Sequence, residues 1–438
     1  MIPFYVMLDI KFIKENKDIV ATVAKNKNSK IDLDELLKVF EERLSLRQAL
    51  DELNQKRNIA AKERNIEEGQ RLKAEDEDLK NKFNEIDKKY ISLMIQVPNI
   101  YSLDTPIGPD ESQNKVLREW GVKPQFTDFE GKPKEHYEIG ADLDIIDTDT
   151  ATEVAGPRFG YLKGDLVLLH FALVNYVFSI LTDRNILDEI AKGANLTINT
   201  KPFVPVLPPV FIKPAVMNRM ARLEPRDDRY FIQSDDLYLI GSAEHTLGPM
   251  HMDEVIDEKD LPIRYAGYST SFRREAGSYG KDMKGIIRLH QFEKLEMETF
   301  CLPETSLQEQ DFLVAIQEYI TKSLNLPYRV VICCTGDMGD PDYRHIDVET
   351  WMPGQDKYRE THSADNMSGF QARRLNTRVK RIDGKMEPVH MNDATAIAGR
   401  TLVAIMENYQ TKEGNIKIPE VLKKYLGGKE FIEKNSTK

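Results

Sequence analysis

The stretch TSFRREAGSYGKDMKGIIRLHQFEKLE spans residues 270–296 and brings cations, aromatic rings and carboxylates together. Its two ends are strand-like, each end carries arginine, and a polar loop containing glycines joins them. Apolar, strand-like runs elsewhere alternate with helical stretches, and no glycine-rich strand-to-helix phosphate loop occurs. We therefore predict an α+β domain built on an antiparallel sheet, in preference to a doubly wound parallel one.

Runs on both sides of this stretch support that prediction. The strand-like runs are residues 203–206, 237–240 and 328–332. The helical stretches are residues 166–183, 306–324 and 401–410. The longest apolar run, 166–181, is interrupted by His170 and Asn175 and is shorter than the roughly 20 residues that span a bilayer, so we interpret it as a core or interface helix.

A different composition marks residues 31–97, where charged and long-chain residues dominate and no proline occurs. Two apolar stripes at helical spacing indicate coiled-coil seams, and residues 65–70 provide a break between them. We expect an antiparallel helical hairpin, whose helices of about 30 residues would reach roughly 45 Å. The stripes consist of Leu46, Leu50, Leu53 and Ala60, and of Leu72, Leu79, Phe83, Ile86, Tyr90 and Leu93.

These observations divide the chain into four parts. We predict an N-terminal domain over residues 1–105 with its arm at about 31–97, and a linker and entry to the core over 106–155, where prolines and an acidic run occur. A catalytic domain over 156–430 and a tail over 431–438 follow.

Composition limits the kinds of partner. The formal net charge of −11 argues against indiscriminate binding of polyanions, so DNA is not an expected partner and any RNA contact must be local. The three cysteines, Cys301, Cys333 and Cys334, form no C-x-x-C pair, so we expect neither disulfides nor a zinc site. With no export signal and no membrane segment evident, the chain is expected to be cytoplasmic, with Met7 as an alternative start.

ATP can be bound without a phosphate loop if cations meet its phosphates, an aromatic face meets adenine and carboxylates hold magnesium. The pattern Phe272-Arg273-x-Glu275, a loop, and then Arg288-x-His290-Gln-Phe292-x-Lys-x-Glu296 resembles motif 2 of class II aminoacyl-tRNA synthetases, in the form typical of seryl-tRNA synthetases. The resemblance implies that Arg273 holds the α-phosphate and later the adenylate. It also implies that Glu275 and Phe292 seat the adenine and that Arg288 fixes phosphates or the acceptor end.

Two further motifs of that family have counterparts. Gly399-Arg400 and the helix after it resemble motif 3, which implies that Arg400 neutralises the terminal phosphate of ATP. Pro208-Pro209, after a strand-like run, lies where motif 1 places its dimer-interface proline, so the resemblance implies a homodimer. Tyr358-Arg-Glu360-x-x-Ser363 resembles the metal-linked segment and implies Glu360 and Ser363 as Mg²⁺ ligands, and Mg²⁺ needs few protein ligands.

The resemblance also implies a serine pocket. Ser242-Ala-Glu244 matches the Thr-x-Glu strand that meets the substrate amino group, Glu296 and Thr395 complete the pocket, and Arg273 and Asn392 join them. A site built to hydrogen-bond a substrate hydroxyl can reject the analogue lacking it by about 10⁴ or more. Alanine would then be refused without editing.

This pocket also departs from the family. Position 242 is Ser in place of the usual Thr, and Asn392-Asp-Ala-Thr-Ala396 replaces the commoner Asn-Gly-Ser, so the alignment near Thr395 could slip by one residue. Residues 363–370 differ from the family form as well. These departures leave amino-acid specificity less settled than ATP chemistry.

The likeness covers nearly the whole chain, because residues 7–13 resemble the family's usual start and the arm matches its tRNA-binding domain. It implies that the arm reaches the long variable arm of tRNA(Ser), by shape and phosphates more than by sequence. Whether selenocysteine tRNA is also charged stays open. The candidate contacts near the arm's tip are Lys56, Arg57, Lys62, Arg64, Arg71 and Lys73.

The resulting prediction is a serine–tRNA ligase that forms seryl-adenylate from L-serine and ATP with Mg²⁺ and passes the seryl group to tRNA. Two alternatives remain at this stage. One is a synthetase-like ligase that charges carrier proteins, but such relatives lack the arm and use zinc-binding cysteines. The other is a catalytically inactive paralogue serving as an RNA-binding or scaffold protein, which only the pocket departures support.

Overall fold

The computed structural model describes residues 9–276 and 284–434. The chain forms two compact units, Met1–Ile100 and Tyr101–Lys438, so the first unit ends slightly before the predicted boundary at residue 105. The middle of the 270–296 loop, residues 7 and 8 of the predicted family start, and residues 435–438 of the predicted tail lie outside the described residues.

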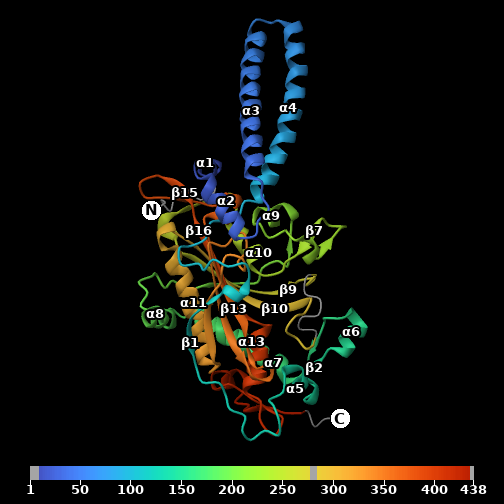
Figure 1. Ribbon diagram of the computed structural model, residues 1–438, viewed down its shortest axis with the longest axis vertical. Coiled ribbons are helices and arrows are strands. Elements are labelled where there is room, and N and C mark those ends of the chain that lie inside the picture. Colours follow the sequence, from blue (N-terminus) through green and yellow to red (C-terminus); the bar gives the residue numbers. More distant parts are fainter. Residues whose placement is uncertain (1–8, 277–283, 435–438) are drawn as a thin grey trace. The chain divides into compact units, whose positions relative to one another are not determined.

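The first unit is helical, and its two longest helices form the predicted hairpin (Figure 1). Asp32 caps the first long helix by accepting hydrogen bonds from the amides of Asp34 and Glu35. Asn65 caps the second by accepting from the amide of Glu68, within the predicted break. The helices are α1 (Ile10–Glu15), α2 (Lys17–Asn26), α3 (Leu33–Lys62) and α4 (Ile66–Ile95).

Apolar and charged side chains together hold α3 against α4. Leu53, Ala60 and Leu72 are buried in one cluster, as the seam predicts. Two ion pairs connect the helices. A guanidinium nitrogen of Arg43 lies 2.5 Å from a carboxylate oxygen of Asp87, and one of Arg57 lies 2.7 Å from an oxygen of Asp76. These pairs fix the antiparallel register of the two helices. The arm is therefore an antiparallel coiled coil.

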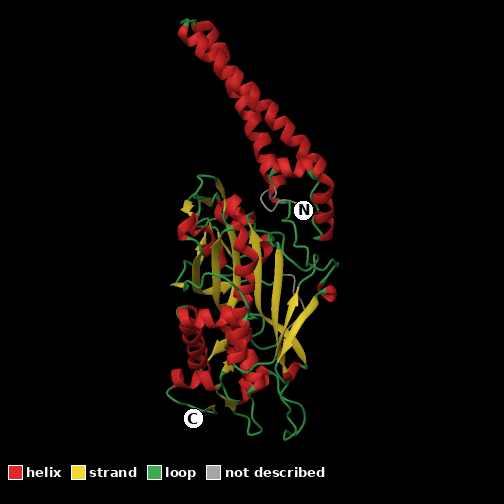
Figure 2. Ribbon diagram, turned by 90° about the vertical axis from the view of Figure 1, so that its left-hand side faces the viewer, coloured by secondary structure: helices red, strands yellow, loops and turns green. Residues whose placement is uncertain are grey.

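The second unit is built on one eight-stranded sheet, which confirms the predicted α+β class (Figure 2). All its neighbouring strands run antiparallel except β4 and β9. The two ends of the 270–296 stretch form the pair β9 and β10, with Phe272 opposite Gln291. In order across the sheet the strands are β1 (Lys115–Trp120), β11 (Tyr328–Ile332), β12 (Arg344–Met352), β13 (Lys357–Ser368), β16 (His390–Ala398), β10 (Gln291–Cys301), β9 (Ile263–Phe272) and β4 (Val204–Val206).

Small sheets and helices surround this core. The short strands are β2 (Ile146–Asp147), β3 (Tyr161–Leu162), β5 (Phe211–Ile212), β6 (Phe231–Ile232), β7 (Leu237–Leu239), β8 (Val255–Asp257), β14 (Arg378–Lys380), β15 (Met386–Pro388), β17 (Ile416–Lys417) and β18 (Phe431–Ile432). The helices are α5 (His136–Asp142), α6 (Asp149–Ala155), α7 (Asp165–Leu181), α8 (Arg184–Gly193), α9 (Pro214–Arg219), α10 (Glu244–Leu247), α11 (Ser306–Ser323), α12 (Phe370–Leu375), α13 (Gly399–Asn408) and α14 (Glu420–Lys423).

The sequence predicts residues 106–155 as a linker and entry to the core. This segment belongs to the second unit and supplies β1, the edge strand beside β11, as well as α5, β2 and α6. Its prolines lie in the connections, while residues 115–120 gain their strand conformation by pairing with β11. A strand that depends on a partner more than 200 residues away leaves little local signal.

Helix α11 covers the face of the sheet opposite the site described below. Gln310 donates from its side-chain amide to the carbonyls of Arg344 and Ala364, at 2.8 Å each. Gln317 does the same to the carbonyls of Ser363 and Thr395. Because side chains alternate along a strand, the buried alanines on this face leave the side chains of Ser363 and Thr395 on the other.

A buried ion pair connects α11 to β9. The guanidinium of Arg264 lies 2.7 Å from the carboxylate of Glu309, and both side chains are at most 1% exposed. We expect Glu309→Ala to lower the free energy of unfolding by about 3–5 kcal/mol, because it leaves a buried cation without its partner. Chemical denaturation of the full chain measures this. The control, Glu304→Ala, removes the exposed partner of Arg381 and should cost less than about 1 kcal/mol; equal small losses for both variants would contradict the account.

The described residues contain no single helix that is long and apolar enough to cross a membrane; α7 and α8 meet the test only as a pair bent by 78°. Helix α7 matches the longest apolar run and buries nine of its residues, as predicted for a core helix.

Candidate active site

A polar cavity of about 960 Å³ opens in the second unit, between the β9–β10 end and the start of α13. All seven residues that the sequence assigns to ATP line it. They come from four segments far apart in the chain: the loop after β9, the start of β10, the strand β13 and the first turn of α13. The seven are Arg273, Glu275, Arg288, Phe292, Glu360, Ser363 and Arg400.

Arg273 is the first residue after β9. Its Nε donates to the carbonyl of Gly241 at 3.0 Å, and its guanidinium carbon lies 5.4 Å from the centre of the Phe292 ring. The ring and the carbonyl fix the side chain in place while its remaining donors face the cavity. This arrangement suits a cation that must meet a phosphate next to an aromatic surface.

Glu275 adopts a left-handed backbone conformation with φ of +52°, which is uncommon for a residue with a Cβ. Its carboxylate accepts from Arg288 at 2.9 Å, and its carbonyl accepts from Arg158 at 3.2 Å. Two arginines thus hold this residue in a conformation that costs free energy, as is common at functional sites.

Arg400 and Glu360 face each other across the cavity wall. The Arg400 guanidinium donates to the carboxylate of Glu360 at 2.8 Å and to its carbonyl at 3.0 Å. Burial alone would raise the pKa of Glu360, but the charge and hydrogen bonds of Arg400 outweigh it and lower the pKa to about 2. Glu360 is therefore ionised at neutral pH, and its side chain is 47% exposed toward the cavity.

Behind this cavity lies a buried polar cluster that contains three of the six predicted serine-binding residues, Ser242, Glu244 and Glu296. Ser242 donates to the carboxylate of Glu296 at 3.1 Å, and Lys294 lies 2.5 Å from the same carboxylate. Glu244 lies 3.1 Å from the guanidinium of Arg222, and carboxylate oxygens of Glu244 and Glu296 lie within 4.8 Å of each other. Thr395, also in the predicted set, lines the main cavity directly, 3.3 Å from the hydroxyl of Ser363.

The two glutamates of this cluster differ in charge. Burial raises the pKa of Glu244, but Arg222 and His245 outweigh it, so that the pKa falls well below its ordinary value. For Glu296 burial dominates over the opposing charge of Lys294, and its pKa rises to about 7. One carboxylate is ready to meet an ammonium, and the other is poised between its two protonation states near neutral pH.

The structure does not bring Asn392 into this cluster. Its side chain is fully buried and donates to Thr299 at 3.3 Å, on the opposite face of β16 from Thr395. The neighbouring Asp393 takes the inward position instead, within 4.8 Å of Glu244 and Glu296. Side chains alternate along a strand, so one position of register places Asn392 on the face away from the cluster and Asp393 on the face toward it.

Three residues of the cluster were missed by sequence reasoning. Lys294 stands inside the 270–296 stretch and could have been found there. Asp393 lies within the noted departure. Arg222, which carries the ion pair to Glu244, follows α9 in a segment with no motif of its own, so only the fold reveals it.

The basic residues near the arm's tip fall into two groups. Arg57 is half-buried and donates to Asp76, which is 5% exposed, so it serves the packing of the arm. Arg71 pairs with Glu68 on the surface. The exposed members are Lys56, Lys62, Arg64 and Lys73, together with Arg71.

Comparisons with known proteins identify the family of the chain. Residues 7–101 match the family model of the seryl-tRNA synthetase N-terminal domain, and residues 230–409 match the class II core domain of tRNA synthetases for G, H, P, S and T. A serine–tRNA ligase of Symbiobacterium thermophilum is 38% identical, over 96% of this chain and 98% of the relative. One of Nitrosopumilus maritimus is 37% identical, over 97% of this chain and its own full length.

A solved structure gives the same result. Seryl-tRNA synthetase from Pyrococcus horikoshii, complexed with ATP, has a TM-score of 0.84 at 35% identity and covers 97% of this chain and 99% of its own. Both domains, their order and the whole length of the chain are matched. The chain belongs to the seryl-tRNA synthetase family.

Proposed function

We propose that this chain is a serine–tRNA ligase, which activates L-serine with ATP and transfers it to tRNA(Ser). The observation that carries the proposal is the convergence of all seven predicted ATP residues on one cavity, with Thr395 on the same wall and the carboxylates of Glu244 and Glu296 behind it. A phosphate-binding wall and an ammonium-binding cluster in one place are what amino-acid activation needs.

In the first step the serine carboxylate attacks the α-phosphate in line and releases pyrophosphate. Arg273 holds the α-phosphate and Arg400 the terminal phosphate, so that charge developing on the phosphate oxygens meets fixed cations. Phe292 and Glu275 seat the adenine, and Arg288 supports Glu275. In the second step the terminal ribose hydroxyl of tRNA attacks the carbonyl carbon of the seryl-adenylate, which forms the seryl ester and releases AMP and the hydroxyl proton. Positioning and charge neutralisation accomplish both steps without a protein nucleophile.

Magnesium fits the wall of this cavity. Glu360 offers an ionised carboxylate and Ser363 a hydroxyl oxygen, and both line the space that the phosphates would fill. Oxygen donors with room for water and phosphate oxygens are what Mg²⁺ prefers. When bound, the ion would neutralise phosphate charge.

The serine pocket is assigned from charge and hydrogen bonding. The ionised Glu244 and the hydroxyl of Ser242 receive the substrate ammonium, and Glu296 with Thr395 receives the hydroxyl. Arg222 keeps Glu244 ionised although it is buried. Threonine's extra methyl group would have to enter this close-packed cluster, and alanine would leave its polar groups without a partner.

For the arm we propose contact with the tRNA backbone through the exposed basic residues Lys56, Lys62, Arg64, Arg71 and Lys73. A homodimer fits the position of Pro208 and Pro209 just after β4, an edge strand of the large sheet. A cytoplasmic enzyme is consistent with three cysteines that form no disulfide. Charging of selenocysteine tRNA is a further possibility that the same arm would allow.

An inactive paralogue finds no support in the cavity. Arg273, Glu275, Glu360 and Arg400 are all present and all face the same space. Loss of any one of them would have favoured that alternative.

We expect kcat/KM for serine in pyrophosphate exchange to rise as the pH increases through about 7. Burial raises the pKa of Glu296 from its ordinary 4.5 to about 7, so the acid is mostly protonated below that pH and ionised above it. Only the carboxylate accepts hydrogen bonds with both oxygens. Initial rates at subsaturating serine from pH 6 to 8.5 test this. Glu296→Gln should lose the step at this pH, and an unchanged profile in that variant would assign the titration elsewhere.

Transfer to tRNA is tested by charging a tRNA(Ser) transcript with labelled serine and ATP. The proposal predicts stable acylation that depends on the arm: Lys62→Glu with Lys73→Glu should raise KM for tRNA and leave pyrophosphate exchange unchanged. A transcript without the long variable arm should be charged poorly. Pyrophosphate exchange without any charging of tRNA would overturn the assigned acceptor.

A further inference from the structure

A second polar cluster lies on the wall of the same cavity and is used by none of the steps above. It is formed where β11, β12 and β13 lie side by side. His345 stands opposite Asp365 in the pairing of β12 with β13, and the amide of Cys333, just after β11, donates to the carbonyl of His345 at 3.0 Å. Asp347, two residues further along β12, points to the same side.

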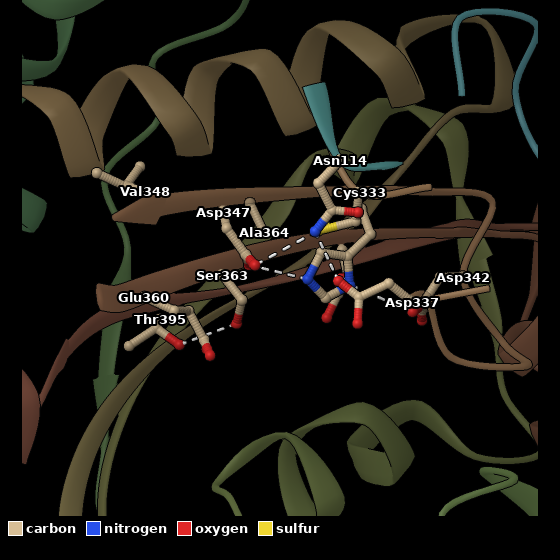
Figure 3. A network of polar contacts seen from close by, with 12 residues as sticks. Asn114, Cys333, Asp337, Asp342, Asp347, Val348, Glu360, Ser363, Ala364 and Thr395 are labelled. Carbon is tan, nitrogen blue, oxygen red and sulfur yellow. Dashed lines mark hydrogen bonds and ion pairs between the residues drawn. The ribbon is translucent and has the colours of Figure 1, made fainter. Parts of the chain in front are cut away.

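Three different donor atoms converge here. Nε2 of His345 lies 2.9 Å from a carboxylate oxygen of Asp347, and the other oxygen of Asp347 accepts from the thiol of Cys333 at 3.4 Å. The sulfur, the imidazole nitrogen and the carboxylate oxygen all lie within 4.8 Å of one another. Figure 3 shows Cys333 and Asp347 on the same side of the sheet as Ser363 and Glu360.

The other nitrogen of His345 is held by carboxylates. Its Nδ1 lies 2.7 Å from Asp365 and 3.4 Å from Asp342. A histidine that ligates a metal through one nitrogen nearly always gives the other N–H to a carboxylate or carbonyl, which fixes the ring and its tautomer. His345 therefore meets both requirements of a metal ligand. Its Nδ1 is held by carboxylates, and its Nε2 lies beside the other two donor atoms.

Charge favours a cation at this place. Three carboxylates, Asp342, Asp347 and Asp365, surround one imidazole, and each of their side chains is at most 13% exposed. The imidazolium and the nearby guanidinium of Arg222, whose charge reaches Asp342 and Asp365, offset two of these three negative charges. Carboxylates that leave water need paired positive charge or a metal ion.

We propose that Cys333, His345 and Asp347 form a binding site for a divalent ion of the zinc class. Zinc is bound by sulfur, imidazole nitrogen and carboxylate oxygen, and three protein ligands with an open fourth position are a common arrangement. His345 and Asp347 line the cavity, so the open position faces the space where the nucleotide is expected. This site differs in its ligand atoms from that of Glu360 and Ser363. Magnesium prefers oxygen ligands, whereas a thiolate selects softer ions.

This proposal departs from the expectation that no zinc is bound. That expectation rested on the absence of paired cysteines along the sequence. Here a single cysteine is brought to the histidine and aspartate by strand register, with one ligand from the end of β11 and two from β12. Such a site has no spacing pattern that sequence reasoning could detect.

The test uses the purified full chain loaded with cobalt(II) in place of zinc. A cysteine thiolate on cobalt gives an intense charge-transfer absorption in the near ultraviolet, which oxygen ligands do not give. We expect this band in the unmodified protein, saturating at one equivalent, and its loss in Cys333→Ser. The matched control is Cys334→Ser, because Cys334 is the next residue, is equally buried and donates instead to the carbonyl of Asp110 at 3.1 Å.

Metal content measured after zinc loading and dialysis gives a second readout. We expect one zinc per chain in the unmodified protein and in Cys334→Ser, and a loss of at least tenfold in occupancy in Cys333→Ser and His345→Gln. Absence of the thiolate band in the unmodified protein overturns the proposal whether or not the variants fold. A band that survives Cys333→Ser overturns it as well. Neither result depends on ligase activity, so the proposed function is not tested by this experiment.

Discussion

Arg273→Ala is expected to lower serine-dependent ATP–pyrophosphate exchange by about 10³-fold, because removing a single preorganised donor at a developing charge already costs 10²–10³. Arg273 is held by the carbonyl of Gly241 and by the Phe292 ring, so its charge is fixed before ATP arrives. Exchange of labelled pyrophosphate into ATP at saturating serine measures the loss.

The matched control is the next residue. Arg274 stacks over the ring of Tyr230 at 5.6 Å and lies outside the cavity, so Arg274→Ala should keep exchange within about twofold, as surface changes usually do. Near-full exchange in Arg273→Ala would refute its role at the α-phosphate. Equal losses in both variants would point to folding instead of catalysis.

Arg400→Ala should be the second most damaging change. Its guanidinium donates to both the carbonyl and the carboxylate of Glu360, and we propose that it also meets the terminal phosphate of ATP. Its removal takes away one phosphate cation and also leaves Glu360 with an unbalanced charge beside the nucleotide. We expect a loss of about 10²–10³-fold in kcat/KM for ATP.

Arg400→Lys separates charge from geometry. Lysine keeps the charge but lacks the planar fork, so we expect it to restore only part of the activity. Arg378→Ala, at an exposed position of strand β14, is the control for loss of an arginine. An Arg400→Ala enzyme whose KM for ATP is unchanged and whose kcat falls less than about twofold would contradict the assignment, since such a loss is under about 0.5 kcal/mol of barrier.

Much of the site could be predicted because it is concentrated in short, strongly patterned segments. Residues 270–296 predicted the pair β9 and β10 and four of the ATP residues, and the pattern around Arg400 predicted the start of α13. The hairpin was predictable for a similar reason, since its apolar stripes and the break at residues 65–70 are local features.

What failed depends on distant partners. Strand β1 exists because β11 lies beside it, and Arg222 acts because α9 brings it to Glu244, so neither carries a local pattern. Asp393, and not Asn392, faces the cluster, and a motif match does not show which face of β16 a residue occupies once the motif has changed. For the same reason the cluster of Cys333 with His345 was invisible until the strands were paired.

The measurement that tests the central claim most directly is ATP–pyrophosphate exchange without tRNA, with serine, threonine, alanine and glycine compared side by side. We predict exchange with serine that exceeds the other three by at least about 10²-fold, because a methyl group in a close-packed pocket or a missing hydroxyl partner costs several kcal/mol. Preferred exchange with another of these amino acids would show that Ser242 and Asp393 have re-specified the pocket, and no exchange with any of them would contradict the assigned activity.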